Sequence, residues 1–176
     1  MTCIAAIAEG GKVYMGADSA TMQGWDLRPS GWGKILKTDH YIIGSCGDAK
    51  IQSLLRYRVI YPEPDSELDR FMATDFLDAL RTAFKDAGYM KIENSVEGMG
   101  GSLVVGCRGR LYEVSSDLCV LPTADGLSAV GCGGQTALAV MWVLKERPPE
   151  ERIKQALEAA EYFSAGVRAP FTVEAL

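Results

Sequence analysis

The sequence predicts an α+β fold, a four-layer α-β-β-α sandwich in which two sheets lie between layers of helices. Strand patterns and helix patterns come in separate blocks, in the order strands, two helices, strands, two helices, strand. Such blocks favour stacked sheets over a βαβ alternation with a parallel sheet. With 176 residues, 48% of them hydrophobic, and no stretch resembling a linker, we expect residues 1–176 to form a single domain.

The first block contains two predicted hairpins. Apolar runs at residues 3–8 and 12–18 flank Gly10-Gly11, a typical hairpin turn. Residues 34–37 and 41–46 form the second predicted hairpin.

The remaining elements follow from periodicity and turn residues. Apolar side chains spaced three and four apart predict helices over 48–59 and 68–87. Strands are expected at 102–107 and 111–116, and a further strand pair at 118–122 and 128–131. The chain is then expected to form helices over 136–146 and 149–163 and a short strand at 171–173.

Composition argues against several classes of function. The net charge is −5, from 18 basic and 23 acidic residues spread along the chain, which argues against nucleic acid as a partner. The five cysteines form no C-x-x-C pair and the single histidine is His40, so we expect no metal and no cofactor. The sequence contains neither a signal-peptide pattern nor an apolar run of the ~20 residues that a membrane helix needs, so we expect a cytoplasmic protein without membrane contact.

Three residues in the first block suggest a specific chemistry. Thr2 follows Met1 directly, Asp18 lies in Gly-Ala-Asp-Ser at the end of the second predicted strand, and Lys34 opens the third in Gly-Lys-Ile. If Met1 is removed, Thr2 carries both a hydroxyl nucleophile and an α-amine that titrates near ~8 and can act as its base. A buried Lys34 would lower the pKa of that amine, and Asp18 could supply the countercharge. Taken singly, each residue also has a purely structural interpretation: a second-position threonine, a turn aspartate and a solvated lysine.

The ordered set of motifs, with its spacing, resembles proteasome β-subunits and HslV, members of the N-terminal-nucleophile hydrolase superfamily. Three downstream motifs extend the resemblance over nearly the whole chain: Gly44-Ser45-Cys46-Gly47-Asp48 is similar to the family's G-x-x-G-D, Gly131-Cys132-Gly133 to its G-S-G, and Glu161 with Ser164 to its D-x-x-S. The segment SAGVRAPF, within residues 161–172, resembles a phage and bacterial branch of the superfamily.

The resemblance implies a set of site residues. The implied catalytic residues are Thr2, Asp18, Lys34, Gly44 (through its backbone N–H, for the oxyanion), Cys132, Glu161 and Ser164, and the implied substrate-binding residues are Thr21, Ile42 and Cys46. The chain departs from the family pattern in three ways: an arginine is missing after Ser19, Cys132 replaces a serine, and Glu161 replaces an aspartate.

The resemblance further implies a threonine peptidase that hydrolyses peptide bonds in peptides or unfolded proteins within a homo-oligomeric ring. It allows an ATPase unfoldase as a partner. Because only Met1 precedes Thr2, removal of Met1 would generate the active form. Two alternatives remain open: a catalytically silent ring or assembly protein, and an amidase of the same chemistry that acts on small amides.

Overall fold

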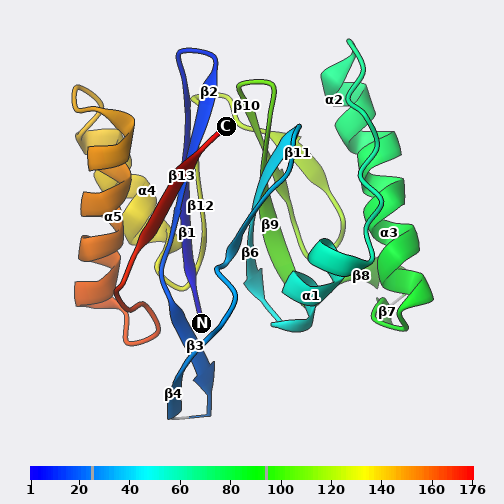
Figure 1. The fold of residues 1–176 in the computed structure, drawn as a ribbon, viewed down its shortest axis with the longest axis horizontal. Coiled ribbons are helices and arrows are strands. Elements are labelled where there is room, and N and C mark those ends of the chain that lie inside the picture. Colours follow the sequence, from blue (N-terminus) through cyan, green and yellow to red (C-terminus); the bar gives the residue numbers. More distant parts are fainter. Residues whose placement is uncertain (25, 94) are drawn as a thin grey trace.

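A computed structural model describes residues 1–24, 26–93 and 95–176 and contains four stacked layers (Figure 1). One sheet has the strand order β12-β1-β2-β13 (Leu127–Gly131, Cys3–Glu9, Lys12–Ala17 and Thr172–Ala175). The other has the order β11-β10-β9-β6-β5 (Val120–Pro122, Arg110–Val114, Gly101–Cys107, Tyr41–Gly47 and Ile35–Lys37). The predicted α-β-β-α sandwich is confirmed.

Helices cover the outer face of each sheet. The first sheet is covered by α4 (Gly134–Val143) and α5 (Pro149–Phe163). The second is covered by α1 (Lys50–Tyr57) and by a long helix made of α2 (Leu68–Phe71), the π-helical segment η1 (Met72–Phe76) and α3 (Leu77–Asp86). These helices agree with the predicted ones to within a few residues.

Strand β1 illustrates why the sequence forms the middle of a sandwich. All of its residues from Cys3 to Ile7 are buried, because both of its faces are covered. Cys3, Ala5 and Ile7 pack against the α4–α5 layer, whereas Ile4 and Ala6 pack against the other sheet. The alternation follows from the period of two in a strand, and the double burial requires an unbroken apolar run.

One predicted strand pairing is wrong. The strands near 118–122 and 128–131 exist as β11 and β12, but they do not pair with each other. Strand β11 pairs with β10 in the second sheet, and β12 pairs with β1 in the first. The chain crosses from one sheet to the other between them, and local sequence patterns do not encode such a crossing.

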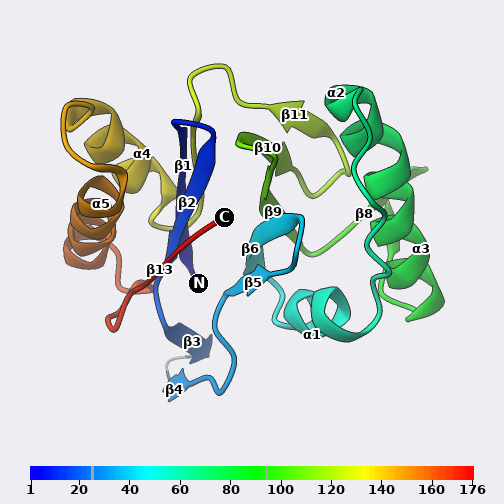
Figure 2. The ribbon, with the colours of Figure 1, turned by 45° about the horizontal axis from the view of Figure 1, so that its top comes forward.

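Two small hairpins were not predicted. β3 (Ala20–Gln23) pairs with β4 (Asp26–Pro29), and β7 (Lys91–Glu93) pairs with β8 (Val96–Gly98). The β3–β4 hairpin projects from the end of the sandwich at which the N-terminus lies (Figure 2). It therefore flanks the surroundings of Thr2.

A buried arginine connects the helix layer to the first sheet. Arg152 of α5 donates to the Met141 carbonyl at 3.1 Å through Nε and at 3.0 Å through Nη2. Its Nη1 lies 2.9 Å from Glu9 Oε2, at the end of β1. Because Arg152 is only 3% exposed, these contacts compensate for the burial of its charge.

Within the described residues, no helix has the length and apolar character needed to cross a bilayer. The same part of the chain contains no cluster of three or more His, Cys, Asp or Glu side chains that could hold a metal ion.

Candidate active site

The pairing of β1 with β2 brings Asp18 to the start of the chain. Ile4 lies opposite Ala17, so Asp18 follows directly beside Cys3. Asp18 Oδ1 accepts from the Cys3 backbone N–H at 2.8 Å, and the Asp18 N–H donates to the Cys3 carbonyl at 3.2 Å. Asp18 is therefore fixed next to Thr2, and both residues are buried.

Lys34 approaches from the second sheet, directly before β5. Its Nζ lies 2.7 Å from Asp18 Oδ1, and the two side chains are 5% and 0% exposed. Lys34 Nζ also donates to the Met1 carbonyl oxygen at 3.4 Å, and the Thr2 hydroxyl donates to the same oxygen at 2.6 Å. A hydroxyl and an ammonium thus converge on the carbonyl that precedes Thr2.

Met1 occupies defined space in this arrangement. Its side chain lies against Gly166, where an added Cβ would come within 2.4 Å of the Met1 Cβ. With Met1 in place, the Thr2 nitrogen belongs to a peptide bond and is not a free amine. Removal of Met1 would free the amine that the chemistry requires as a base.

Cys132 and Ser164 lie on the other side of Thr2. The Cys132 thiol donates to the Thr2 carbonyl at 3.4 Å, and the Ser164 hydroxyl donates to Cys132 Sγ at 3.3 Å. The structure thus places Cys132 next to Thr2, and Ser164 next to Cys132. A thiol is a weaker hydrogen-bond donor than the serine hydroxyl that the resemblance implies at this position.

Glu161 has a more distant position. Its carboxylate accepts from the Ala169 backbone N–H at 3.0 Å, which fixes the segment that follows Ser164. In this structure Glu161 orients that segment and, within the described residues, makes no hydrogen bond to Thr2.

Sequence reasoning missed the backbone of Arg168. Asp18 Oδ2 accepts from the Ala20 N–H at 3.0 Å and from the Arg168 N–H at 3.3 Å, and the Ser19 N–H donates to the Arg168 carbonyl at 3.0 Å. The only sequence signal was the segment SAGVRAPF, noted above as a resemblance and not as a ligand of Asp18.

A cavity of about 100 Å³ opens beside Thr2. It is lined by Met1, Thr2, Ala20, Thr21, Met22, Lys34, Ser45, Cys46, Gly47, Asp48, Ala49 and Gln52. Thr21 and Cys46, both expected to bind substrate, lie in this lining. Ile42 does not: it is fully buried in the core between the two sheets. Its prediction as a substrate-binding residue is wrong, because it is the second residue of β6 and packs in the core between the two sheets.

Gly44 is also outside the cavity, so its assignment as the oxyanion donor is wrong. Gly44 lies in the middle of β6, between Ile35 of β5 and Val104 of β9. The N–H groups of an antiparallel strand point alternately to its two neighbours. Since the neighbouring Ser45 N–H donates to the Lys34 carbonyl on the β5 side, the Gly44 N–H points to the β9 side, away from Lys34.

Gly47 has the opposite orientation. The Ser45 N–H donates to the Lys34 carbonyl at 3.3 Å, so by the same alternation the Gly47 N–H points to the Lys34 side, beyond the end of β5. Its φ of +98° favours glycine, and a Cβ at this position would lie 2.4 Å from the Gly100 carbonyl oxygen. Gly47 therefore places a backbone donor in the cavity.

Two of the nearby thiols are poor nucleophiles. Burial, reinforced by the negative charge of Asp18, raises the pKa of Cys3 to about 12. Burial also raises the pKa of Cys46 above its ordinary value. Because the thiolate is the reactive form, neither Cys3 nor Cys46 is a good candidate nucleophile at neutral pH.

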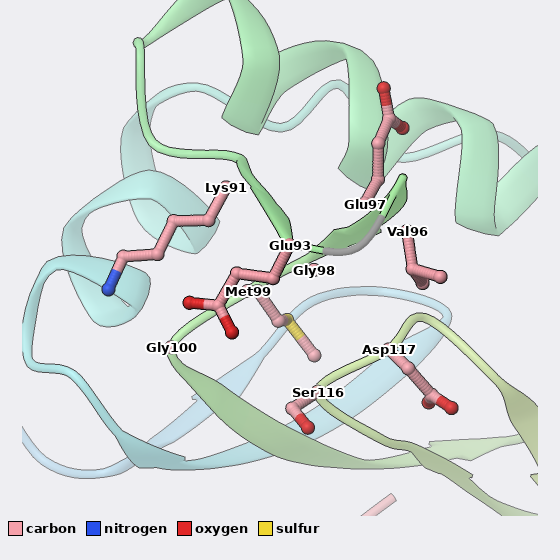
Figure 3. A pocket seen from close by; sticks show the side chains of 9 residues that line it. All are labelled: Lys91, Glu93, Val96, Glu97, Gly98, Met99, Gly100, Ser116 and Asp117. Carbon is pink, nitrogen blue, oxygen red and sulfur yellow. The ribbon is translucent and has the colours of Figure 1, made fainter.

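A larger hollow of about 390 Å³ lies elsewhere, beside the β7–β8 hairpin (Figure 3). The Met99 side chain points into it, while the carboxylates of Glu93, Glu97 and Asp117 point away from one another (Figure 3). Glu97 is paired with Arg81. Carboxylates that diverge cannot act on one reacting atom, so size alone does not make this hollow the reactive site.

Comparison with known structures gives the fold. BPH from Thiobacillus denitrificans in complex with epoxomicin superposes with a TM-score of 0.84 at 18% identity, covering 99% of this chain and 98% of that one. BPH alone gives 0.84 at 17% identity, with 99% and 97% covered. HslV from Trypanosoma brucei gives 0.71 at 20% identity, with 99% of both chains covered. The chain has the proteasome/HslV-like fold. No protein-family model and no curated protein matches the sequence.

Within the proteasome/HslV-like fold, the first residues of β1 lie between the two sheets at one end of the sandwich. Thr2, Asp18 and Lys34 meet at this end although they adjoin three different strands, β1, β2 and β5. The resemblance drawn from sequence motifs and the likeness in structure therefore agree on the fold.

Proposed function

We propose that, after removal of Met1, the chain is an N-terminal threonine peptidase that hydrolyses peptide bonds, with Thr2 as its nucleophile. The observation that carries the proposal is the buried Lys34–Asp18 pair, 2.7 Å apart, against Thr2. Burial of an ion pair is costly and adds little stability over an apolar pair, so a positive charge placed beside a threonine hydroxyl calls for a chemical reason.

The proposed reaction uses the atoms already described. The free α-amine of Thr2 takes the hydroxyl proton as Oγ attacks the scissile carbonyl. The Gly47 N–H, in place of Gly44, donates to the developing oxyanion. The protonated amine then passes its proton to the leaving amine as the C–N bond breaks, which leaves an ester on Thr2. Water, deprotonated by the same amine, hydrolyses that ester and regenerates the hydroxyl.

Lys34 and Asp18 support the base. The Lys34 ammonium lies close enough to the Thr2 backbone to oppose protonation of the amine. Asp18 holds Lys34 in place, while Cys132 and Ser164 orient the Thr2 peptide. We also assign Thr21 and Cys46 to substrate contacts, since both line the cavity.

The proposal is tested with protein whose N-terminus is Thr2, released from a cleavable fusion. We expect hydrolysis of fluorogenic peptides and formation of an epoxomicin adduct, detected by intact mass; epoxomicin is the compound in the BPH complex. Thr2→Ala should abolish both signals, and Lys34→Met should lower the rate by on the order of 100-fold. The exposed Thr74→Ala variant serves as the matched control. Undiminished hydrolysis by Thr2→Ala would refute the assignment.

The second candidate is a catalytically silent assembly protein. The Cys132 thiol beside the Thr2 carbonyl favours it, because it stands where the resemblance implies a serine and a thiol is the weaker hydrogen-bond donor. The N-terminal mass of protein purified without a fusion discriminates between the two. Activity on small amides, with none on longer peptides, would instead identify an amidase.

We further propose that the chain assembles with copies of itself, in a ring. Helix α4 carries no charged residue, yet Trp142 and Val143 are 64% and 69% exposed. An exposed apolar helix face of this kind is typical of an interface. Light scattering should report an oligomer, and Trp142→Glu should reduce its mass while the surface variant Lys154→Glu should not.

An ATPase unfoldase partner is tested by asking whether such a protein stimulates the hydrolysis of unfolded substrates.

A further inference from the structure

A second hollow adjoins Ser19, the residue that follows Asp18. It measures about 370 Å³ and is lined by Ser19, Leu27, Arg28, Ser30, Arg168, Ala169 and Pro170. Its walls come from the β3–β4 hairpin and from the segment that follows α5. The hairpin also carries Thr21, which lines the cavity beside Thr2, and the segment after α5 contacts Asp18 through the Arg168 backbone N–H.

Two arginines, Arg28 and Arg168, line this hollow. Arg28 is exposed and Arg168 is half-buried, and neither forms an ion pair within 4.0 Å among the described residues. The Arg168 guanidinium donates to the Val167 carbonyl at 2.9 Å, so it retains further N–H groups for a ligand. In a chain of net charge −5, two such arginines in one hollow form a local positive site.

The rest of the lining supports binding of an acidic side chain. Leu27 and Pro170 provide apolar surface for methylene groups, and apolar walls strengthen charge pairing by reducing contact with water. The Ser19 hydroxyl donates to the Arg168 carbonyl at 3.2 Å. A guanidinium binds a carboxylate through two parallel N–H donors, which makes arginine the residue suited to this task.

The hollow is rigidly connected to the candidate active site. The Arg168 N–H donates to Asp18 Oδ2 at 3.3 Å, and the Ser19 N–H donates to the Arg168 carbonyl at 3.0 Å. On the hairpin, Arg28 lies directly opposite Thr21, which lines the cavity beside Thr2. Paired strands are about 4.8 Å apart, so an extended peptide that passes Thr21 comes within reach of Arg28.

We propose that this hollow is a subsite for an aspartate or glutamate side chain of the peptide substrate, bound by Arg28 and Arg168. The proposal rests on the proposed peptidase function and adds a substrate class to it: peptides with an acidic residue a few positions from the scissile bond.

The test uses pairs of fluorogenic peptides that differ only by Glu or Gln at one position, varied along both sides of the cleaved bond. At one position, Met1-free protein should give a kcat/KM about two to five times higher for Glu, the range of an exposed ion pair. The Glu-to-Gln ratio should fall to about one in Arg28→Gln and in Arg168→Gln, and the latter keeps the backbone N–H that binds Asp18. Arg28→Glu should favour a Lys peptide instead. Arg110→Gln, in β10 of the five-stranded sheet, is the matched control and should leave the Glu-to-Gln ratio of kcat/KM unchanged.

The outcomes separate this subsite from the peptidase itself. Equal rates for Glu and Gln at every position, or a preference that survives both arginine variants, would overturn the subsite and leave the peptidase standing. If Met1-free protein cleaves nothing, the peptidase proposal fails, and fluorescence anisotropy of the same labelled peptides then decides the subsite. Tighter binding of Glu peptides that is lost in Arg28→Gln would support it, and equal binding would refute it.

Discussion

Replacing Lys34 by Met removes the charge from the buried pair with Asp18 while keeping a similar length of side chain. The pair is separated by 2.7 Å, with side chains 5% and 0% exposed. Breaking such a pair from one side costs roughly 3–5 kcal/mol, because the other charge stays buried. Asp18 keeps three backbone donors, from Cys3, Ala20 and Arg168. We therefore expect the lower end of the range, about 3 kcal/mol.

The measurement is urea unfolding of Lys34→Met, Asp18→Asn and the double variant, at one protein concentration because assembly contributes to stability. The double variant leaves no lone charge in the interior. It should therefore be less destabilised than the sum of the single variants, by on the order of 2 kcal/mol.

Two results would refute this reasoning. A loss below about 0.5 kcal/mol for Lys34→Met is the size expected of a surface substitution and would mean that the lysine is solvated in solution. Strict additivity in the double variant would mean that the two charges do not interact. Either result would also remove the main support for the chemistry at Thr2.

Three further predictions concern packing and titration. Gly88→Ala should cost about 1 kcal/mol, because Gly88 has a positive φ but no atom close to an added Cβ. Gly47→Ala should destabilise the fold by more, because Gly47 has a positive φ and its added Cβ would also meet the Gly100 carbonyl. Equal midpoints of urea unfolding for the two variants would contradict this. Arg152→Met should lower the free energy of unfolding by about 2–4 kcal/mol, because it removes both donors to the buried Met141 carbonyl. The surface variant Arg147→Met should change it by less than about 0.5 kcal/mol. Similar losses for the two variants in thermal unfolding would count against the buried contacts. The pKa of Cys3 is raised to about 12 in the fold, so its thiol stays neutral while that of the unfolded chain ionises. Stability should therefore be unaffected well below pH ~8.5 and fall as the pH rises towards ~12, and Cys3→Ala should flatten that fall; an unchanged slope would exclude the effect.

The position of the candidate site could be predicted because its key residues lie at the ends of strongly patterned elements. The hairpin turn at Gly10-Gly11 fixes the pairing of β1 with β2, and this pairing alone brings Asp18 beside Cys3. The local sequence was therefore enough to predict that Asp18 lies beside the start of β1. The approach of Lys34 was inferred from the spacing of the motifs and by resemblance, since nothing in the sequence around it specifies the opposite sheet.

The errors have a shared cause. Gly44 and Gly47 are both glycines of the same motif, and only the register of β6 between β5 and β9 decides which N–H points towards Lys34. Ile42 and Cys46 lie on the same face of β6, and only the packing of the layers decides that Cys46 lines the cavity while Ile42 is buried deeper in the core. A change of one residue in register reverses the direction of every side chain and every N–H along a strand.

The sequence by itself determined the layer order, the helices and most strands, because apolar periodicity and turn residues act over a few neighbouring positions. It also determined which residue types are available for chemistry at the N-terminus. Only the tertiary structure decided that β11 and β12 belong to different sheets, and that the Met1 carbonyl accepts from both Thr2 and Lys34. It alone brought Arg28 of β4 and Arg168, which follows α5 near the other end of the chain, into one hollow. These features depend on contacts between distant segments, whose geometry is set when the layers pack and is not written in any local pattern.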